Sequence, residues 1–477
     1  MSILGILYWL SRLIAIAAII HVVMGNRQPA KTIAWALVIY FVPLVGVVAY
    51  IFLGTNTRKE RQVNRRSMDQ LEKRSMLGFV QQKDLQLPEP HKPVIDLFVN
   101  ESFSLPFNGN SVEMLTDGYQ FFPLLLSDIA SAKSHIHIDI YIFDNDALGL
   151  LVSDALIAKA RQGVEVRVIY DDVGCWNVKN KFFERMRVEG IEVEPFMPVR
   201  FPSFARRANY RNHRKLFVID GRVGYIGGMN IALRYVKGRN AAKDKHSRWR
   251  DTMLRIEGRG VYTLQRAFLV DWYFVDRTLL SDRKYYPEGA GDGAKCLLQT
   301  VTSGPTSPYP EIMQGYVRII MAARRYVYIE TPYFLPTTAV LYALKTAAQA
   351  GVDVRVLIPY KSDARFTALA SRSYLREAMG AGVQIGMYTP GFLHSKLMVC
   401  DDTIATCGST NMDFRSFENN FEANAFIYDE DFARRVRQVF LDDENDSLTL
   451  ASYLEKNGTT FIARLGESFA RLFSPLL

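Results

Sequence analysis

Two long apolar stretches dominate the start of the chain. Residues 33–53 contain no charged side chain, and these 21 positions, at 1.5 Å per helical residue, span the roughly 30 Å of a bilayer core. Residues 3–24 form a second apolar run, interrupted by Arg12 and His21. A cleaved signal peptide is the alternative for this first run, although a basic start and a small-residue cleavage site are missing. The pattern predicts a transmembrane helical hairpin with helices at about 3–24 and 33–53.

The rest of the chain alternates short apolar strands with helical segments, and the alternation occurs twice. The segment at 160–168 (ARQGVEVRV) matches the one at 348–356 (AQAGVDVRV), and in each a helix end and a glycine precede a buried strand. Upstream, the alternating run at 135–143 matches the run at 326–334. Strands that alternate with helices favour an α/β fold. We therefore expect two related α/β halves, each with a mostly parallel sheet.

Composition marks the boundary between these halves. Residues 282–310 are rich in Gly, Pro and Ser, as linkers commonly are. We expect a membrane anchor with a basic flank over residues 1–74, a first half over 75–295 and a second half over 296–477.

Apolar residues recur at helical spacing near the carboxyl end, namely Phe461, Ile462, Leu465, Phe469, Leu472 and Phe473. We expect this face to pack against the second half, with insertion into a membrane as the alternative.

The net charge of +9 is unevenly distributed. Residues 1–74 hold ten Lys or Arg against three acidic residues, whereas the remaining chain is close to neutral. A basic cluster that directly follows a transmembrane segment marks the cytoplasmic side and lies against anionic headgroups. The charge therefore predicts a membrane-bound protein with a cytoplasmic main body, and it gives little support to a nucleic-acid groove. The four cysteines form no CxxC pair, so neither a zinc ribbon nor a redox dithiol is indicated.

Each half carries the same four polar residues at identical spacing. The two copies comprise His213, Lys215, Asp220 and Asn230, and His394, Lys396, Asp401 and Asn411. Because residues two apart on a strand share a face, the histidine and the lysine of each copy point the same way. The aspartate has the opposite parity and falls where the strand turns. We therefore expect it to brace the turn rather than to touch the imidazole of its own motif.

Two imidazoles, two ammonium groups and two amides that converge between the halves would form a site for a phosphate. One neutral imidazole can attack phosphorus while its charged partner protonates the leaving alkoxide, and the lysines would hold the phosphoryl oxygens. No residue set with metal-ligand spacing accompanies the motifs, so neither a metal nor another cofactor is expected. The candidate catalytic residues are His213, Lys215, Asp220, His394, Lys396 and Asp401, with Asn230 and Asn411 as amides that orient the phosphate.

A basic and aromatic segment surrounds the first motif. Residues 195–219 contain six Lys or Arg and no acidic residue, with Phe201, Phe204 and Tyr210 interleaved. Beside a membrane anchor this combination favours anionic phospholipid headgroups, and a solvated basic loop is the alternative.

The paired motifs resemble the HKD motifs of the phospholipase D superfamily, and the chain is similar to the bacterial cardiolipin synthases of that superfamily along almost its whole length. The resemblance extends to residues 249–252 (WRDT), 408–417 (GSTNMDFRSF) and 471–477 (RLFSPLL). It implies a two-step transfer without metal through a phosphatidyl-histidine intermediate, in which His213 attacks and His394 acts as general acid and then as base. Asp251 and Glu422 match the acids that orient the histidines. The sequence does not decide which histidine attacks.

The implied reaction converts two phosphatidylglycerols into cardiolipin and glycerol at the bacterial inner membrane. The resemblance thus implies a multi-pass protein with a cytoplasmic catalytic part and anionic phospholipids, phosphatidylglycerol and cardiolipin, as partners. Nothing local distinguishes water from a lipid hydroxyl as the acceptor, so a hydrolytic phospholipase D is one alternative. A membrane-anchored nuclease or nucleic-acid binder is a second, disfavoured because phosphate tracking needs an extended basic surface.

Overall fold

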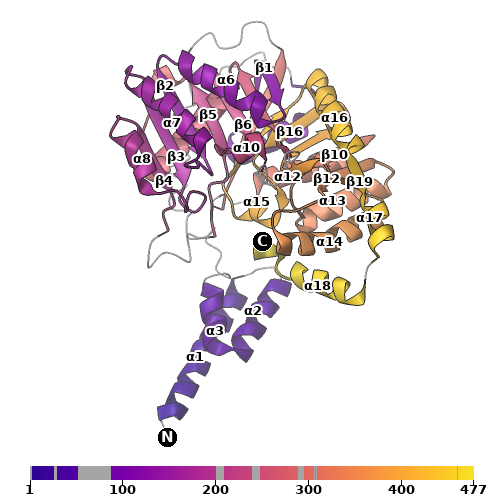
Figure 1. The fold of residues 1–477 in the computed structure, drawn as a ribbon. Coiled ribbons are helices and arrows are strands. Elements are labelled where there is room, and N and C mark those ends of the chain that lie inside the picture. Colours follow the sequence, from indigo (N-terminus) through magenta and orange to yellow (C-terminus); the bar gives the residue numbers. More distant parts are fainter. Residues whose placement is uncertain are drawn as a thin grey trace.

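The chain forms a helical N-terminal part and a larger α/β body (Figure 1). The computed structural model describes residues 3–25, 29–51, 87–199, 209–238, 248–287, 295–305, 307, 309–458 and 460–476. The basic flank at 58–74, the arginines and phenylalanines at 200–207 and part of the expected linker lie outside the described residues.

The N-terminal part contains α1 (Ile3–Met24), α2 (Pro29–Phe41) and α3 (Pro43–Ala49). Among the described helices, only the one over residues 5–24 is long and apolar enough to cross a bilayer by itself. The second apolar stretch is helical from Pro29 but breaks at Val42, because Pro43 lacks an N–H and disfavours helical geometry in the residue before it. The expectation of an unbroken second helix was therefore wrong. Buried side chains join the three segments, namely Ala15, Val22, Ile39 and Tyr50.

One mixed sheet of 15 strands runs through both halves of the body. The first half contributes β1 (Phe107–Leu115), β2 (His135–Ile140), β3 (Glu165–Asp171), β4 (Glu192–Phe196), β5 (Lys215–Ile219), β6 (Val223–Gly227) and β8 (Met253–Glu257). The second half contributes β9 (Cys296–Ser303), β10 (Tyr326–Glu330), β12 (Asp353–Pro359), β13 (Gln384–Tyr388), β15 (Leu397–Cys400), β16 (Ile404–Gly408), β18 (Glu422–Ile427) and β19 (Ser447–Thr449).

The strand order itself is duplicated. From the outer side inward it runs β4-β3-β2-β5-β6-β8-β1 in the first half and β13-β12-β10-β15-β16-β18-β9 in the second, where β19 adds one more strand outside β13. The innermost strands, β1 and β9, pair antiparallel at the seam. The internal repeat of the sequence thus corresponds to a repeat of topology, and the motif strands β5 and β15 occupy equivalent places.

The expectation of mostly parallel sheets was wrong. Within the main sheet, parallel pairing joins only β2 to β3 to β4 and β10 to β12 to β13 among the described strands. Along the chain, a helix lies between consecutive strands of each of these runs. The motif strands instead form the hairpins β5–β6 and β15–β16, and strands joined by a tight turn pair antiparallel.

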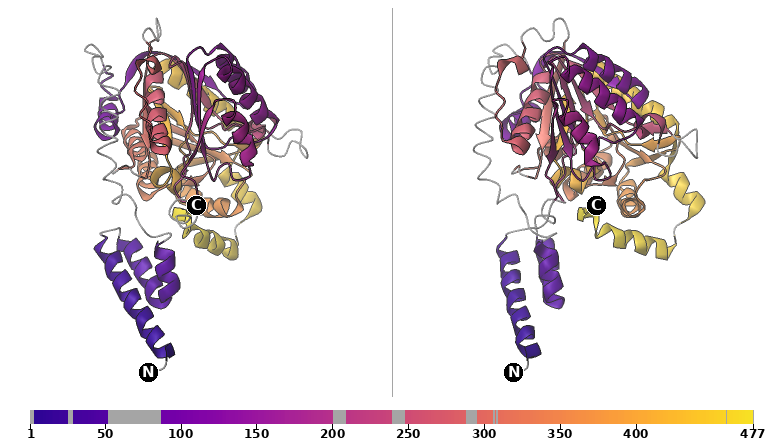
Figure 2. Two further views of the ribbon diagram at one scale, coloured as in Figure 1. Left: turned by 90° about the vertical axis from the view of Figure 1, so that its left-hand side faces the viewer. Right: turned by 60° about the vertical axis from the view of Figure 1, so that its left-hand side comes forward.

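Helices cover the sheet in both halves (Figures 1 and 2). Those of the first half are α5 (Lys92–Ser102), α6 (Gly118–Ser131), α7 (Ala147–Ala160), α8 (Asn180–Arg187), α10 (Arg234–Lys237) and α11 (Val261–Asp276). Those of the second are α12 (Glu311–Ala322), α13 (Thr338–Gln349), α14 (Arg365–Gly380), α15 (Phe414–Glu418), α16 (Glu430–Asn445), α17 (Leu450–Asn457) and α18 (Phe461–Arg471). One apolar core cluster contains side chains of both halves, including Leu216, Leu254, Leu397 and Phe440. The two halves are therefore one packed unit.

Short pairings tie the halves together around the two motifs. The strand β7 (Arg248–Arg250) pairs parallel with β14 (Gly391–Leu393), directly before His394. A bridge joins Asn212 to Phe421, directly before His213. A third short pair joins β11 (Phe334–Leu335) to β17 (Met412–Asp413) within the second half.

The carboxyl-terminal helix α18 packs on α14, but not through its apolar face. The side chains that it buries are Glu467 and Ala470, and Glu467 pairs with Arg376 of α14. The large apolar residues are exposed, with Phe461 and Ile462 each 79% accessible. The helix thus lies against the second half as expected, whereas the expectation that its apolar face makes this contact was wrong.

Candidate active site

Backbone pairing between the halves places each motif histidine beside a carboxylate of the other half. The His213 N–H donates to the carbonyl of Phe421 at 2.9 Å, and Glu422 is the next residue. The His394 N–H donates to the carbonyl of Arg250 at 2.7 Å, and Asp251 is the next residue. The same local geometry is therefore built twice.

The result is an exchange of imidazole–carboxylate pairs. His213 Nδ1 lies 3.0 and 3.1 Å from the two carboxylate oxygens of Glu422. His394 Nδ1 lies 2.6 Å from Asp251 Oδ2. With Nδ1 facing a carboxylate, the ring proton is held there and Nε2 is left as the reactive atom.

Burial sets the charge of these pairs. It lowers the pKa of His394 to about 4, and the Lys396 ammonium, whose Nζ lies 2.8 Å from the ring nitrogen Nδ1, acts in the same direction. Burial also lowers the pKa of His213. For Asp251 and Glu422 burial opposes ionisation, but nearby lysines and histidines outweigh it, so both carboxyl pKa values are lowered. The rings are therefore neutral and the acids ionised near neutral pH.

The motif lysines are fully buried behind the histidines. Lys215 Nζ donates to the carbonyl of His213 at 2.5 Å, and Lys396 Nζ donates to the carbonyl of His394. Burial lowers the pKa of Lys215 to about 7 and that of Lys396 to about 8. Neither lysine is among the residues that line the cleft described below.

The motif aspartates brace the fold away from the histidines, as strand parity predicted. The Asp220 carboxylate accepts backbone N–H groups of Lys133, Ser134 and His135 at 2.7–2.9 Å. Asp401 accepts the equivalent N–H groups of residues 324–326. Neither aspartate lines the cleft, so their place among the candidate catalytic residues is not supported by the geometry.

A cleft of about 400 Å³ lies between the halves, and both histidines line it. Asn230 and Asn411 line it as well. They differ in their partners, since Asn230 accepts the Ile142 N–H at 3.0 Å and donates to the Tyr235 hydroxyl at 2.5 Å. The buried Asn411 Oδ1 has no hydrogen-bond partner among the described residues. Four motif residues thus line one cavity. Of the two asparagines, only Asn411 has an amide oxygen that makes no hydrogen bond among the described residues and could bind a ligand.

The cations in the cleft wall are arginines. Arg211 pairs with buried Asp171 at 3.3 Å, whereas Arg234 and Arg415 make no ion pair among the described residues. Arg214 is one of the six cations at 195–219 that the sequence assigned to headgroup binding, but it is buried and pairs with Asp271 instead. That assignment was wrong, because the charge of Arg214 is neutralised in the interior.

Sequence reasoning also missed several cleft residues, namely Tyr141, Tyr235, Tyr333, Asp363 and Asn420. Tyr141 and Tyr333 each follow a parallel strand. The carboxyl ends of such strands commonly carry binding residues, a signal that could have found them.

Asp413 caps α15 through the Ser416 N–H at 2.7 Å, and burial raises its pKa to about 6. Within the described residues, no three His, Cys, Asp or Glu side chains cluster so that they could hold a metal ion.

Two imidazoles, each backed by a carboxylate, at one arginine-lined cleft can transfer a phosphoryl group when one attacks in its neutral form and the other is protonated and acts as general acid. A duplicated α/β fold with such a cleft defines a phospholipase D-like protein. The family described as "Cardiolipin synthase, PLD-like domain" matches residues 125–261 and 316–443, and that described as "Phospholipase_D-nuclease N-terminal" matches residues 13–54. The chain belongs to the cardiolipin synthase family.

Relatives match along the whole chain. The major cardiolipin synthase of Bacillus subtilis (strain 168) is 38% identical over 496 residues, which cover 100% of both chains. A cardiolipin synthase of Listeria monocytogenes serotype 4a (strain HCC23) is 38% identical over 470 residues, 96% of each chain. A phosphatidylserine synthase of Haemophilus influenzae has a similar fold, with a TM-score of 0.60 and 15% identity over 81% of this chain and 100% of its own.

Proposed function

We propose that this protein is a membrane-bound phosphatidyltransferase that converts two phosphatidylglycerols into cardiolipin and glycerol. The observation that carries the proposal is the exchanged pair of imidazole–carboxylate contacts at one cleft, His213 with Glu422 and His394 with Asp251. The full-length similarity to cardiolipin synthases supplies the lipid chemistry.

In the proposed first step, His213 Nε2 attacks the phosphorus of one phosphatidylglycerol. A phosphorus–nitrogen bond forms while the bond to the glycerol oxygen breaks, and protonated His394 gives its proton to that oxygen. The anionic phosphate supplies a reason for His394 to be protonated at this point, since a nearby negative charge raises an imidazole pKa.

In the second step, the glycerol hydroxyl of another phosphatidylglycerol gives its proton to His394 and attacks the phosphorus. The phosphorus–nitrogen bond breaks, His213 returns to its neutral state, and cardiolipin leaves. Arg234 and Arg415, which line the cleft, would hold the phosphoryl oxygens, and Asn411 would orient them. Lys215 and Lys396 would act from behind, by fixing the histidine carbonyls.

The membrane arrangement that we propose is a hairpin in which α1 crosses the bilayer and α2 with α3 returns to the same side. The body, with halves at 75–295 and 296–477, would then lie in the cytoplasm at the bacterial inner membrane. Cysteines introduced at residues 26 and 90 test this, because an impermeant thiol reagent applied to intact cells should label the first and spare the second. Labelling at residue 90 would contradict the orientation.

The activity is tested with purified protein in phosphatidylglycerol vesicles, followed by identification of the lipids by mass. Cardiolipin should form together with one glycerol, and His213→Ala and His394→Ala should each abolish it, because nucleophile and acid act as a unit. Phosphatidic acid as the dominant product would instead support a hydrolytic phospholipase D. Trapping of the covalent adduct on His394 would reverse the roles of the two histidines.

A further inference from the structure

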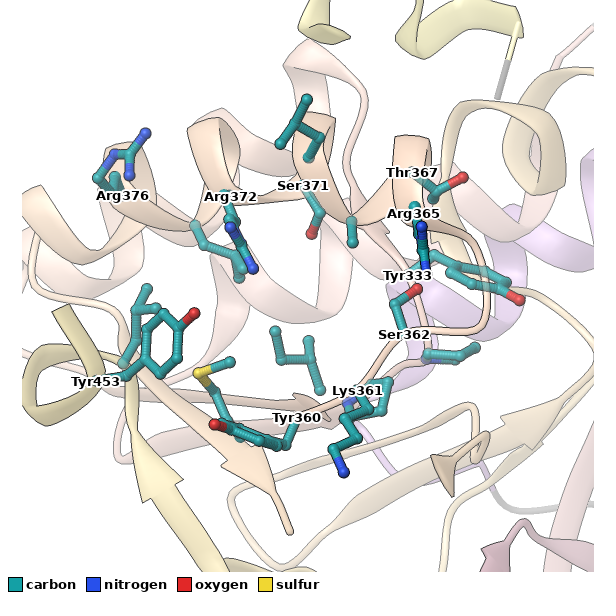
Figure 3. Close-up of a pocket in the computed structure, with 18 of the residues that line it drawn as sticks. Tyr333, Tyr360, Lys361, Ser362, Arg365, Thr367, Ser371, Arg372, Arg376 and Tyr453 are labelled. Carbon is teal, nitrogen blue, oxygen red and sulfur yellow. The ribbon is translucent and has the colours of Figure 1, made fainter. Parts of the chain in front are cut away.

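A second cavity adjoins the catalytic cleft in the second half of the body. It has a volume of about 470 Å³ and lies between α14, the end of β12 and α17 (Figure 3). We call it the α14 pocket. Its size falls within the range of about 300–1,000 Å³ that is usual for small-molecule sites.

The lining of the α14 pocket is positively charged. Arg365 and Arg372 descend from α14 toward Tyr360 and Lys361 on the opposite wall (Figure 3). None of the described residues that line the pocket is acidic. Arg372 lies over the Tyr453 ring at 5.9 Å, and it makes no ion pair among the described residues. Arg376 also lines the pocket but pairs with Glu467, so Arg365 and Arg372 are the lining arginines that make no ion pair among the described residues.

Much of the remaining lining is apolar. Leu369, Leu375, Met387, Leu450 and Leu454 form a surface next to the cations. A free phosphate or another small polar anion would leave this surface without a partner. An anionic group attached to a hydrocarbon chain would use both parts, since apolar area removed from water stabilises the complex by roughly 25 cal/mol per Å².

The pocket adjoins the catalytic cleft. Tyr333 and Thr367 line both cavities. The Tyr333 hydroxyl donates to Asp363 at 2.8 Å, and Asp363 lines the cleft. A molecule in the α14 pocket would thus lie beside Tyr333, which also borders the cleft that holds the two histidines.

We propose that the α14 pocket binds the second anionic phospholipid, the one whose glycerol hydroxyl accepts the phosphatidyl group. This rests on the proposed function. While the first lipid has its phosphorus at His213, the acceptor must keep its own phosphate beside that site, and two like charges at such short range repel. Arg365 and Arg372 offset this repulsion and hold the acceptor phosphate in the pocket.

The test separates the two steps of the reaction. In phosphatidylglycerol vesicles, glycerol release reports the first step, and the ratio of cardiolipin to phosphatidic acid reports which acceptor captures the intermediate. Arg372→Glu should lower that ratio by about tenfold, the loss expected for one charge-assisted contact, while glycerol release continues at a similar rate. Arg372→Lys, which keeps the charge, should restore most of the ratio.

The matched control is Arg318→Glu, a charge reversal at an exposed arginine of α12 that lines neither cavity. It should leave both readouts unchanged, and thermal unfolding should show that all three variants are folded. An unchanged product ratio in Arg372→Glu would overturn the proposal. An equal loss of glycerol release would overturn it too, because the pocket would then serve the donor. If the unsubstituted protein made no cardiolipin at all, the proposed function itself would fail.

Discussion

The imidazole of His213 is held by Glu422, a carboxylate 209 residues further along the chain and in the other half of the body. The reciprocal contact joins His394 to Asp251, 143 residues earlier. Each half therefore supplies the nitrogen base of one pair and the acid of the other. Neither half by itself can orient its own histidine.

Replacing either acid by its amide should remove activity without unfolding the protein. Glu422→Gln and Asp251→Asn keep the size of the side chain but lose the charge that holds the imidazole proton on Nδ1. By analogy with the aspartate of serine protease triads, kcat should fall on the order of 10⁴-fold. Turnover in phosphatidylglycerol vesicles measures this. Asp429→Asn, at the N-cap of α16, is the matched control, and wild-type turnover in Glu422→Gln would refute the orienting role.

The two motif asparagines should respond differently to the same change. Asn230→Ala removes the acceptor of the Ile142 N–H and the donor to the Tyr235 hydroxyl. It should therefore lower the free energy of unfolding by about 1–3 kcal/mol. Asn411→Ala removes an oxygen that has no partner among the described residues, so it should reduce kcat with little change in thermal midpoint. Parallel unfolding and turnover measurements compare the pair. Equal effects of both substitutions on stability would contradict this distinction.

The motif aspartates should behave as structural residues. Asp220→Ala leaves the N–H groups of Lys133, Ser134 and His135 without their side-chain acceptor, which should cost on the order of 1–3 kcal/mol for each of the two part-buried groups, those of Ser134 and His135. Activity per folded molecule should stay close to that of the parent. Circular dichroism melting together with turnover of the soluble fraction measures both. A large loss of turnover with an unchanged melting curve would instead assign Asp220 to catalysis.

The free energy of unfolding should fall as the pH is lowered from about 6.5 to about 4. In this range His394 is charged in the unfolded chain but neutral in the folded protein. The folded pKa is lowered to about 4 from 6.5, so between these values the unfolded chain binds a proton that the folded protein does not. By linkage this favours unfolding, by up to about 3 kcal/mol at the acid end. The thermal midpoint measured across that range should therefore decrease, and less steeply in His394→Asn. Identical slopes in the two proteins would rule out His394 as the source.

Much of the active-site arrangement could be predicted from the sequence, because repeated motifs and the alternation of side chains along a strand follow directly from the order of the residues. The equal spacing of His213 with Lys215 and of His394 with Lys396 identified the two motifs, and parity correctly placed Asp220 at a turn. The exchange of acids could not be predicted, since it depends on the pairing of Asn212 with Phe421 across the seam between the halves.

Other differences have similar physical causes. The sequence marks strands that are connected by helices, among which the parallel pairs occur, but it does not show how the motif hairpins pair, and antiparallel pairing dominates the sheet. Whether a buried cation faces a cavity or an internal carboxylate is decided by tertiary contacts. Arg214 pairs with Asp271, whereas Arg415 lines the cleft.

The outward-facing side chains of α18 have a practical consequence for handling the protein. Because the helix is attached to α14 through Glu467 and Ala470, its phenylalanines remain part of the body even when α1 to α3 are removed. An apolar strip of this kind adsorbs detergent and promotes self-association in plain buffer. Deleting the N-terminal helices would thus give a fragment that still requires a surfactant for purification.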